Sequence, residues 1–147
     1  MAKQRPHIDE ILTAYLAAQV KDKTGLCRRR VISADDRLRS CMEAEGHRIL
    51  TDGDRSVLDL EREFDPVGAF ARTMHADDLL FMLTIFVKDA WLPQDRVDRS
   101  VQLRYADGLA TQIVAWRLVD QGDMSCALYE LQGTIRRAKA ALSTRSP

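Results

Sequence analysis

Apolar side chains recur every three or four residues along most of this chain, which is the spacing of amphipathic helices. The first such segment begins after Pro6 and continues to Val20, before Gly25 can stop it. Asp9 and Glu10 fall in its first turn, where acidic side chains suit the helix dipole. The pattern predicts a first helix that buries Ile8, Ile11, Leu12, Tyr15, Leu16 and Val20.

The second helix has two possible starting points. Ser33 and Asp36 have the spacing of a capping box, which would begin the helix there. A longer helix would begin near Gly25, because the apolar spacing of about 3.5 residues extends back that far. In both cases Gly46 ends the helix. The residues that carry the longer pattern are Cys27, Val31, Ala34, Leu38 and Cys41.

Two shorter helices are expected in the middle of the chain. Asp52 or Asp54 can cap the third helix, and Asp65 followed by Pro66 is a strong signal for the start of a fourth. The third helix should then bury Val57, Leu58, Leu60 and Phe64. The fourth should carry Val67, Phe70 and Met74 on one side.

Residues 79–87 are apolar except for Thr84, so they should be buried on every side. Asp77 and Asp78 can open a helix here, and the pattern continues through Trp91. That length exceeds a typical strand, which favours a buried central helix over residues 79–91.

Two long helices are expected in the last third of the chain. One begins at Asp95 and runs to about Gln121, with inward positions Val97, Val101, Tyr105, Leu109, Ile113 and Trp116. Gly108 lies inside it at a cost of about 1 kcal/mol relative to alanine, which is best tolerated where another backbone approaches closely. The other helix runs from about Met124 to Leu142 with heptad spacing, and can pack internally or against a second copy. Its candidate self-association residues are Leu128, Leu131, Ile135, Ala138 and Leu142.

These elements predict an all-α fold, a single compact multi-helix bundle of about six to seven helices forming one domain over residues 1–147. The chain is long enough to bury a core, and 46% of it is hydrophobic. No signal peptide or membrane-spanning stretch is apparent, so no membrane partner is expected. The three cysteines are far apart and form no CxxC pair. We therefore expect buried free thiols in a cytoplasmic protein.

The charges balance in number but not in position. Lys and Arg total 22, as do Asp and Glu, so neither a strongly basic nor a strongly acidic protein is indicated. Residues 51–100, however, hold 11 acidic and 6 basic side chains. A basic cluster could contact phosphate or nucleic acid, or face the acidic stretch of the same or a neighbouring chain. The cluster is Lys21, Lys23, Arg28, Arg29 and Arg30, and the acidic stretch is Asp52, Asp54, Asp59, Glu61, Glu63 and Asp65.

The candidate chemistry is sparse. His7 with Glu10, His47 with Glu43, and His75 with its neighbouring aspartates could ligate a metal, but no HExxH or paired-histidine spacing supports this. Structural roles are expected instead, with His75 orienting the junction before the central helix. No nucleophile elbow or glycine-rich phosphate loop occurs. No catalytic residue, metal site or cofactor is predicted.

The leading functional hypothesis is a non-enzymatic helical interaction or regulatory module that self-associates or binds another protein. A DNA-associated accessory protein using the basic cluster at residues 21–30 is the second hypothesis. A small-ligand-binding or metal-dependent helical protein is the third.

Overall fold

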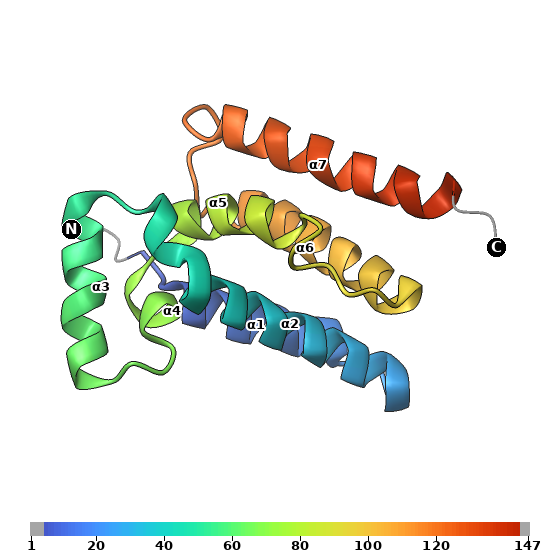
Figure 1. Cartoon of the computed structure of the whole chain (residues 1–147), viewed down its shortest axis with the longest axis horizontal. Coiled ribbons are helices and arrows are strands. Elements are labelled where there is room, and N and C mark those ends of the chain that lie inside the picture. Colours follow the sequence, from blue (N-terminus) through green and yellow to red (C-terminus); the bar gives the residue numbers. More distant parts are fainter. Residues whose placement is uncertain (1–4, 145–147) are drawn as a thin grey trace.

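The computed structural model describes residues 5–144, and within that range the chain forms seven α-helices, one short 3-10 helix and no strand (Figure 1). The predicted all-α class is confirmed. In chain order the elements are α1 (Ile8–Val20), α2 (Gly25–Glu45), η1 (Gly46–Ile49), α3 (Asp52–Phe64), α4 (Ala69–Thr73), α5 (Ala76–Phe86), α6 (Arg96–Ala115) and α7 (Ser125–Thr144).

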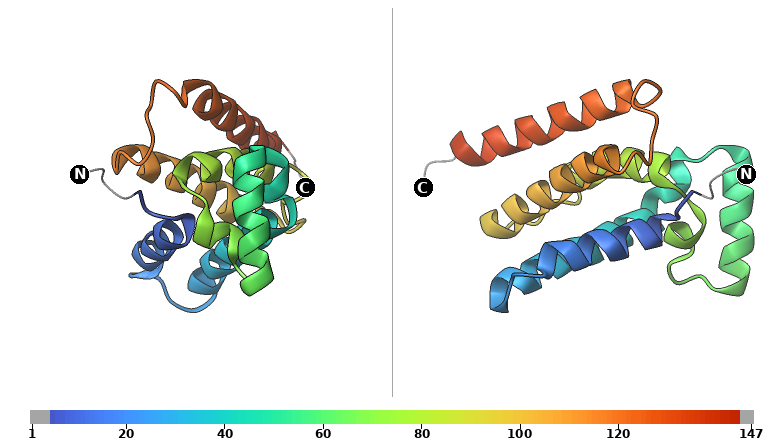
Figure 2. Two further views of the ribbon diagram at one scale, coloured as in Figure 1. Left: turned by 90° about the vertical axis from the view of Figure 1, so that its left-hand side faces the viewer. Right: turned by 180° about the vertical axis from the view of Figure 1, so that it is seen from behind.

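The long helices lie in layers. The α1–α2 hairpin packs on α5 and α6, and α7 covers the other side of α5 and α6 (Figures 1 and 2). α3 stands across one end of this arrangement and has α4 as its main neighbour. The free end of the α1–α2 hairpin lies at the opposite end of the molecule.

α5 is the central helix that the apolar pattern predicts, but it is not buried on every side, because Phe81 is 44% exposed. It touches α1, α2, α6 and α7, and Leu79, Leu80 and Leu83 are fully buried. The helix ends at Phe86, however, and not at Trp91. The buried amide of Gln102 explains this early end, because it donates hydrogen bonds to the carbonyls of both Phe86 (3.1 Å) and Trp91 (2.9 Å) and so holds the turn between them.

The structure resolves the open boundaries. α2 takes the longer alternative and begins at Gly25. α3 is capped by Thr51, whose side chain accepts a hydrogen bond from the Asp54 amide, so the expected caps at Asp52 and Asp54 were wrong. α4 begins at Ala69, after a left-handed Gly68, and not at Asp65 and Pro66.

α6 also ends earlier than expected, at Ala115 and not near Gln121. Arg117 has a φ of 57°, and the amides of Arg117 and Leu118 donate to the carbonyls of Val114 and Ile113. This pattern is a Schellman motif, which satisfies the last carbonyls of a helix while turning the chain away. Because the helix has ended, Trp116 lies exposed and does not extend the buried stripe.

The heptad seam of α7 packs inside its own chain. Leu128, Leu131 and Ile135 are buried, and Ala138 and Leu142 are half-buried against the same core. The neighbouring helices are α5 and α6. In the described chain the seam packs on these two helices, and pairing of two copies through the same five side chains would require α7 to leave its own core.

Candidate interaction surface

α3 turns an apolar face to the outside. Val57, Leu60 and Phe64 are spaced i, i+3, i+7 on one side of the helix, and Val67 follows in the next turn. All four are exposed, with Phe64 at 81% and Val67 at 79%. The expected inward positions of Val57, Leu60 and Phe64 were wrong; only Leu58 of this helix is buried. We call these four residues the α3 stripe.

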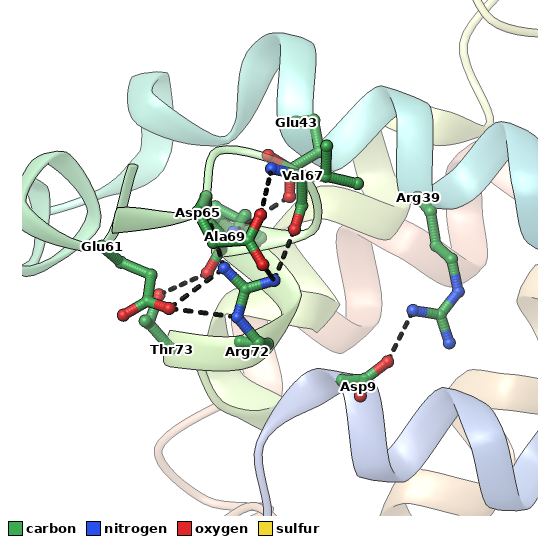
Figure 3. Close-up of polar contacts among 10 residues, drawn as sticks. Asp9, Arg39, Glu43, Glu61, Asp65, Val67, Ala69, Arg72 and Thr73 are labelled. Carbon is green, nitrogen blue, oxygen red and sulfur yellow. Dashed lines mark hydrogen bonds and ion pairs between the residues drawn. The ribbon is translucent and has the colours of Figure 1, made fainter. Parts of the chain in front are cut away.

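A polar network fixes this orientation of α3 (Figure 3). Arg72 of α4 donates through Nε to Glu61 (3.1 Å) and through Nη2 to the carbonyl of Asp65 (2.7 Å). Arg62 donates to the carbonyl of Glu43 on α2 (3.0 Å). The Glu43 carboxylate in turn accepts from the Phe70 amide (2.9 Å). These bonds hold the charged side of α3 against the bundle, so the apolar side is left without a neighbour.

The surface around the α3 stripe is acidic. Asp59 and Glu63 are exposed and form no ion pair with any residue in the range 5–144. The arginines of this region donate to other groups. Arg62 donates to the Glu43 carbonyl, Arg72 to Glu61, and Arg55 to the carbonyl of His47 (2.9 Å). The exposed face therefore combines a contiguous apolar stripe with uncompensated negative charge.

The predicted basic cluster lies at the other end of the molecule, around the turn between α1 and α2 (Figure 1). It therefore does not face the acidic stretch of its own chain. The structure also divides it into two groups. Lys23 donates to the carbonyl of Gln19 (2.7 Å) and Arg30 pairs with Asp98 of α6 (3.2 Å), so these two face the interior side of the hairpin.

The remaining basic residues face outward. Arg28 donates to the carbonyl of Val20 (3.3 Å) at the end of α1, while Lys21 and Arg29 are exposed. Leu26 lies among them and is 53% exposed. We call Lys21, Leu26, Arg28 and Arg29 the hairpin tip, a second surface that joins an apolar side chain with charge, here positive.

The histidines have structural positions. His7 and His75 form an isolated antiparallel bridge, and their rings stack with centroids 4.7 Å apart. The His75 amide donates to Asp78 (3.3 Å) and its Nδ1 contacts the carbonyl of Pro6 (3.1 Å), so His75 does orient the start of α5. Among residues 5–144 no group of three or more His, Cys, Asp or Glu side chains could hold a metal ion.

The expectation of three buried thiols was wrong for two of them. Cys41 is buried, but Cys27 and Cys126 are exposed. Each exposed cysteine lies in the first turn of its helix, α2 or α7. Val97, in the first turn of α6, is exposed as well and not inward.

None of the helices described here is both long enough and apolar enough to span a bilayer. The chain matches no family model, no curated protein and no solved structure.

Proposed function

We propose that the protein is a non-enzymatic helical interaction module that self-associates head to tail, with the α3 stripe of one copy binding the hairpin tip of the next. The observation that carries the proposal is the exposure of Val57, Leu60 and Phe64 on one face of α3, with Val67 exposed in the turn that follows. Scattered exposed apolar residues are ordinary, but several on one helix face mark a contact surface.

Charge complementarity supports a second copy as the occupant. The α3 stripe is bordered by Glu63, three residues after Leu60, whereas Leu26 of the hairpin tip is bordered by Arg29, three residues further along α2. Each surface thus combines apolar side chains with charge, negative on the α3 stripe and positive on the hairpin tip. This complementarity favours association and fixes its register. Two α3 stripes face to face would instead bring like carboxylates together.

Such a contact is heterologous, because two different surfaces of the chain meet. Every dimer then keeps one free α3 stripe and one free hairpin tip, so assembly continues into open chains and does not close at two copies. The average mass should rise with protein concentration. It should fall at high salt, because exposed charges are screened.

Sedimentation of complementary variants tests the proposal. Phe64→Glu removes the α3 stripe, and Leu26→Glu with Arg29→Glu removes the hairpin tip. Each variant alone should be monomeric, while an equimolar mixture should form a heterodimer that grows no further. Tyr129→Glu is the matched control, because Tyr129 is equally exposed (82%) but lies on neither surface.

Two results would overturn head-to-tail assembly. A wild-type chain that stays monomeric at every concentration removes self-association altogether. A wild-type chain that associates while the mixed variants stay monomeric means that the contact pairs identical surfaces.

A DNA-associated accessory role is the second candidate, and the exposure of Lys21 and Arg29 favours it. Phosphate contacts predict an affinity for duplex DNA that falls steeply with salt. Arg29→Glu should weaken that binding, whereas Phe64→Glu should leave it unchanged. This difference separates the two candidates, because both variants block head-to-tail assembly.

We further propose the cytoplasm as the location of the protein. Cys27 and Cys126 are exposed and unpaired. Exposed free thiols persist in reducing compartments and are oxidised elsewhere, which supports this location.

A further inference from the structure

A cavity of about 300 Å³ opens on the interior side of the α1–α2 hairpin, between the start of α2 and the first half of α6. Residues from both sides of the hairpin turn line it, including Lys23, Cys27 and Arg30. α6 contributes Val97, Val101 and Arg104. We call this cavity the anion cleft, for the reasons that follow.

The anion cleft has an excess of positive charge. Lys23, Arg30 and Arg104 line it, and the only ion pair that these three make within residues 5–144 is that of Arg30 with Asp98 (3.2 Å). Lys23 donates to a neutral backbone carbonyl, and the Arg104 guanidinium has no partner in the described part of the chain. Two of the three cations are therefore uncompensated.

The other wall of the anion cleft is apolar. Val97, Val101 and Tyr105 lie on one face of α6, and Val31 of α2 is opposite. Val97 is 47% exposed, although the spacing of α6 predicts an inward position. An apolar wall beside unpaired cations, which come from different segments, is the arrangement expected of a site for an organic anion.

We propose that the anion cleft binds a phosphate monoester that carries a small apolar body, such as an aryl group. The two negative charges of the phosphate match the two uncompensated cations, with Arg104 suited to bidentate phosphate contact. The apolar body packs on Val97 and Val101. The cavity volume is at the lower end of the range for small-molecule sites, so the ligand is small.

This site adjoins the hairpin tip. Arg30 lies four residues after Leu26 and so neighbours it on α2, whereas Cys27 lies about 100° from Leu26 around the helix. The Arg104→Gln change on α6 therefore tests ligand binding without altering a hairpin-tip residue.

Calorimetric titration with three probes tests the proposal. Phenyl phosphate should bind, whereas inorganic phosphate and phenol should each bind at least about tenfold more weakly, because each supplies half of the required contacts. Arg104→Gln should weaken phenyl phosphate at least about tenfold, by loss of a charged hydrogen bond. Arg136→Gln is the matched control, since it removes an exposed arginine on α7 that lines neither the cleft nor the hairpin tip, and it should leave affinity unchanged.

Thiol alkylation gives an independent readout on the same sample. Phenyl phosphate should slow the alkylation of Cys27, which lines the cleft, and leave that of Cys126 unchanged. Three results would overturn the proposal: no saturable binding, equal weakening by Arg104→Gln and Arg136→Gln, or equal protection of Cys27 and Cys126. Circular dichroism confirms that the exposed-site variants keep their helix content.

Discussion

The hydroxyl of Tyr105 on α6 donates a 2.6 Å hydrogen bond to the carboxylate of Asp35 on α2, and both side chains are almost wholly buried. Arg39 balances the buried charge by donating to Asp35 (3.0 Å) and to Asp9 on α1 (2.8 Å). Tyr15 of α1 completes the network by donating to the Tyr105 carbonyl (3.0 Å). Three helices are thus joined by one set of satisfied polar groups, which specifies their relative register.

Tyr105→Phe should destabilise the protein. The substitution leaves one oxygen of Asp35 without its donor in a buried site, which costs about 1–3 kcal/mol. Urea denaturation at neutral pH measures the loss. Tyr129→Phe is the control, because an exposed hydroxyl should change the free energy of unfolding by less than about 0.5 kcal/mol. Equal stability of the two variants would contradict the assigned network.

Ionisation of Tyr105 should lower the stability of the protein at alkaline pH. Burial, together with the Asp35 carboxylate, raises the pKa of Tyr105 above its ordinary value of 10.0. The folded chain then holds the phenolic proton to higher pH than the unfolded chain, so this contribution is complete below pH 10 and is lost as pH rises further.

Comparison of wild type with Tyr105→Phe isolates the effect. Above pH 10 the wild type should lose up to about 1.4 kcal/mol per pH unit more than the variant, so their free energies of unfolding converge. Urea denaturation at a series of pH values measures both curves. Curves that stay parallel would mean that the phenol ionises equally in both states.

Two glycines inside helices should respond oppositely to alanine. A Cβ at Gly108 would overlap the hydroxyl of Tyr15, so Gly108→Ala should destabilise by about 1–3 kcal/mol. A Cβ at Gly133 would meet only the mobile end of Arg137, so Gly133→Ala should stabilise by up to about 1 kcal/mol. Thermal and urea unfolding measure both changes.

A double variant tests the cause at Gly108. With Tyr15→Phe the hydroxyl is gone, so Gly108→Ala should cost less in that background than in the wild type. Additive costs would show that another contact opposes the added methyl group. The steric partner found here is a side chain, whereas the sequence led us to expect a close backbone.

Two phenylalanines separate the exposed stripe from the core. Phe64→Ser should change the free energy of unfolding by less than about 0.5 kcal/mol, because the ring is exposed in the monomer. Phe70→Ala should cost about 3–5 kcal/mol, because that ring is fully buried. Urea denaturation at low protein concentration measures both. A large loss in Phe64→Ser would mean that α3 packs with its stripe inward.

The cysteines should differ in reactivity. Cys27 and Cys126 are exposed, whereas burial raises the pKa of Cys41 to about 12 and keeps it as the unreactive thiol. Iodoacetamide under native conditions should therefore modify two sites, and three in denaturant. Peptide mass spectrometry identifies them, and rapid native labelling of Cys41 would contradict the packing of α2.

Helix content and the central helix followed from sequence because both depend on local spacing. The stripe of α1 has one apolar face, and residues 79–87 are apolar except for Thr84, so most of this segment is buried, although Phe81 is exposed. The structural role of His75 was predicted for a similar reason. It is a polar residue directly before an apolar helix, a place where side chains commonly position the start of the helix.

The sequence alone also determined that α3 has an apolar stripe and that the α7 seam has heptad spacing, but a stripe does not specify which element covers it. That choice depends on the packing of distant segments. The hydrogen bonds of Arg72 and Glu43 leave the apolar face of α3 exposed. The seam of α7 is covered by α5 and α6. The packing of α2 on α6 brings Arg30 and Arg104 to one cleft. The spacing of apolar residues determines which side of each helix is apolar. Contacts between segments that are distant in the sequence determine which element, if any, covers that side.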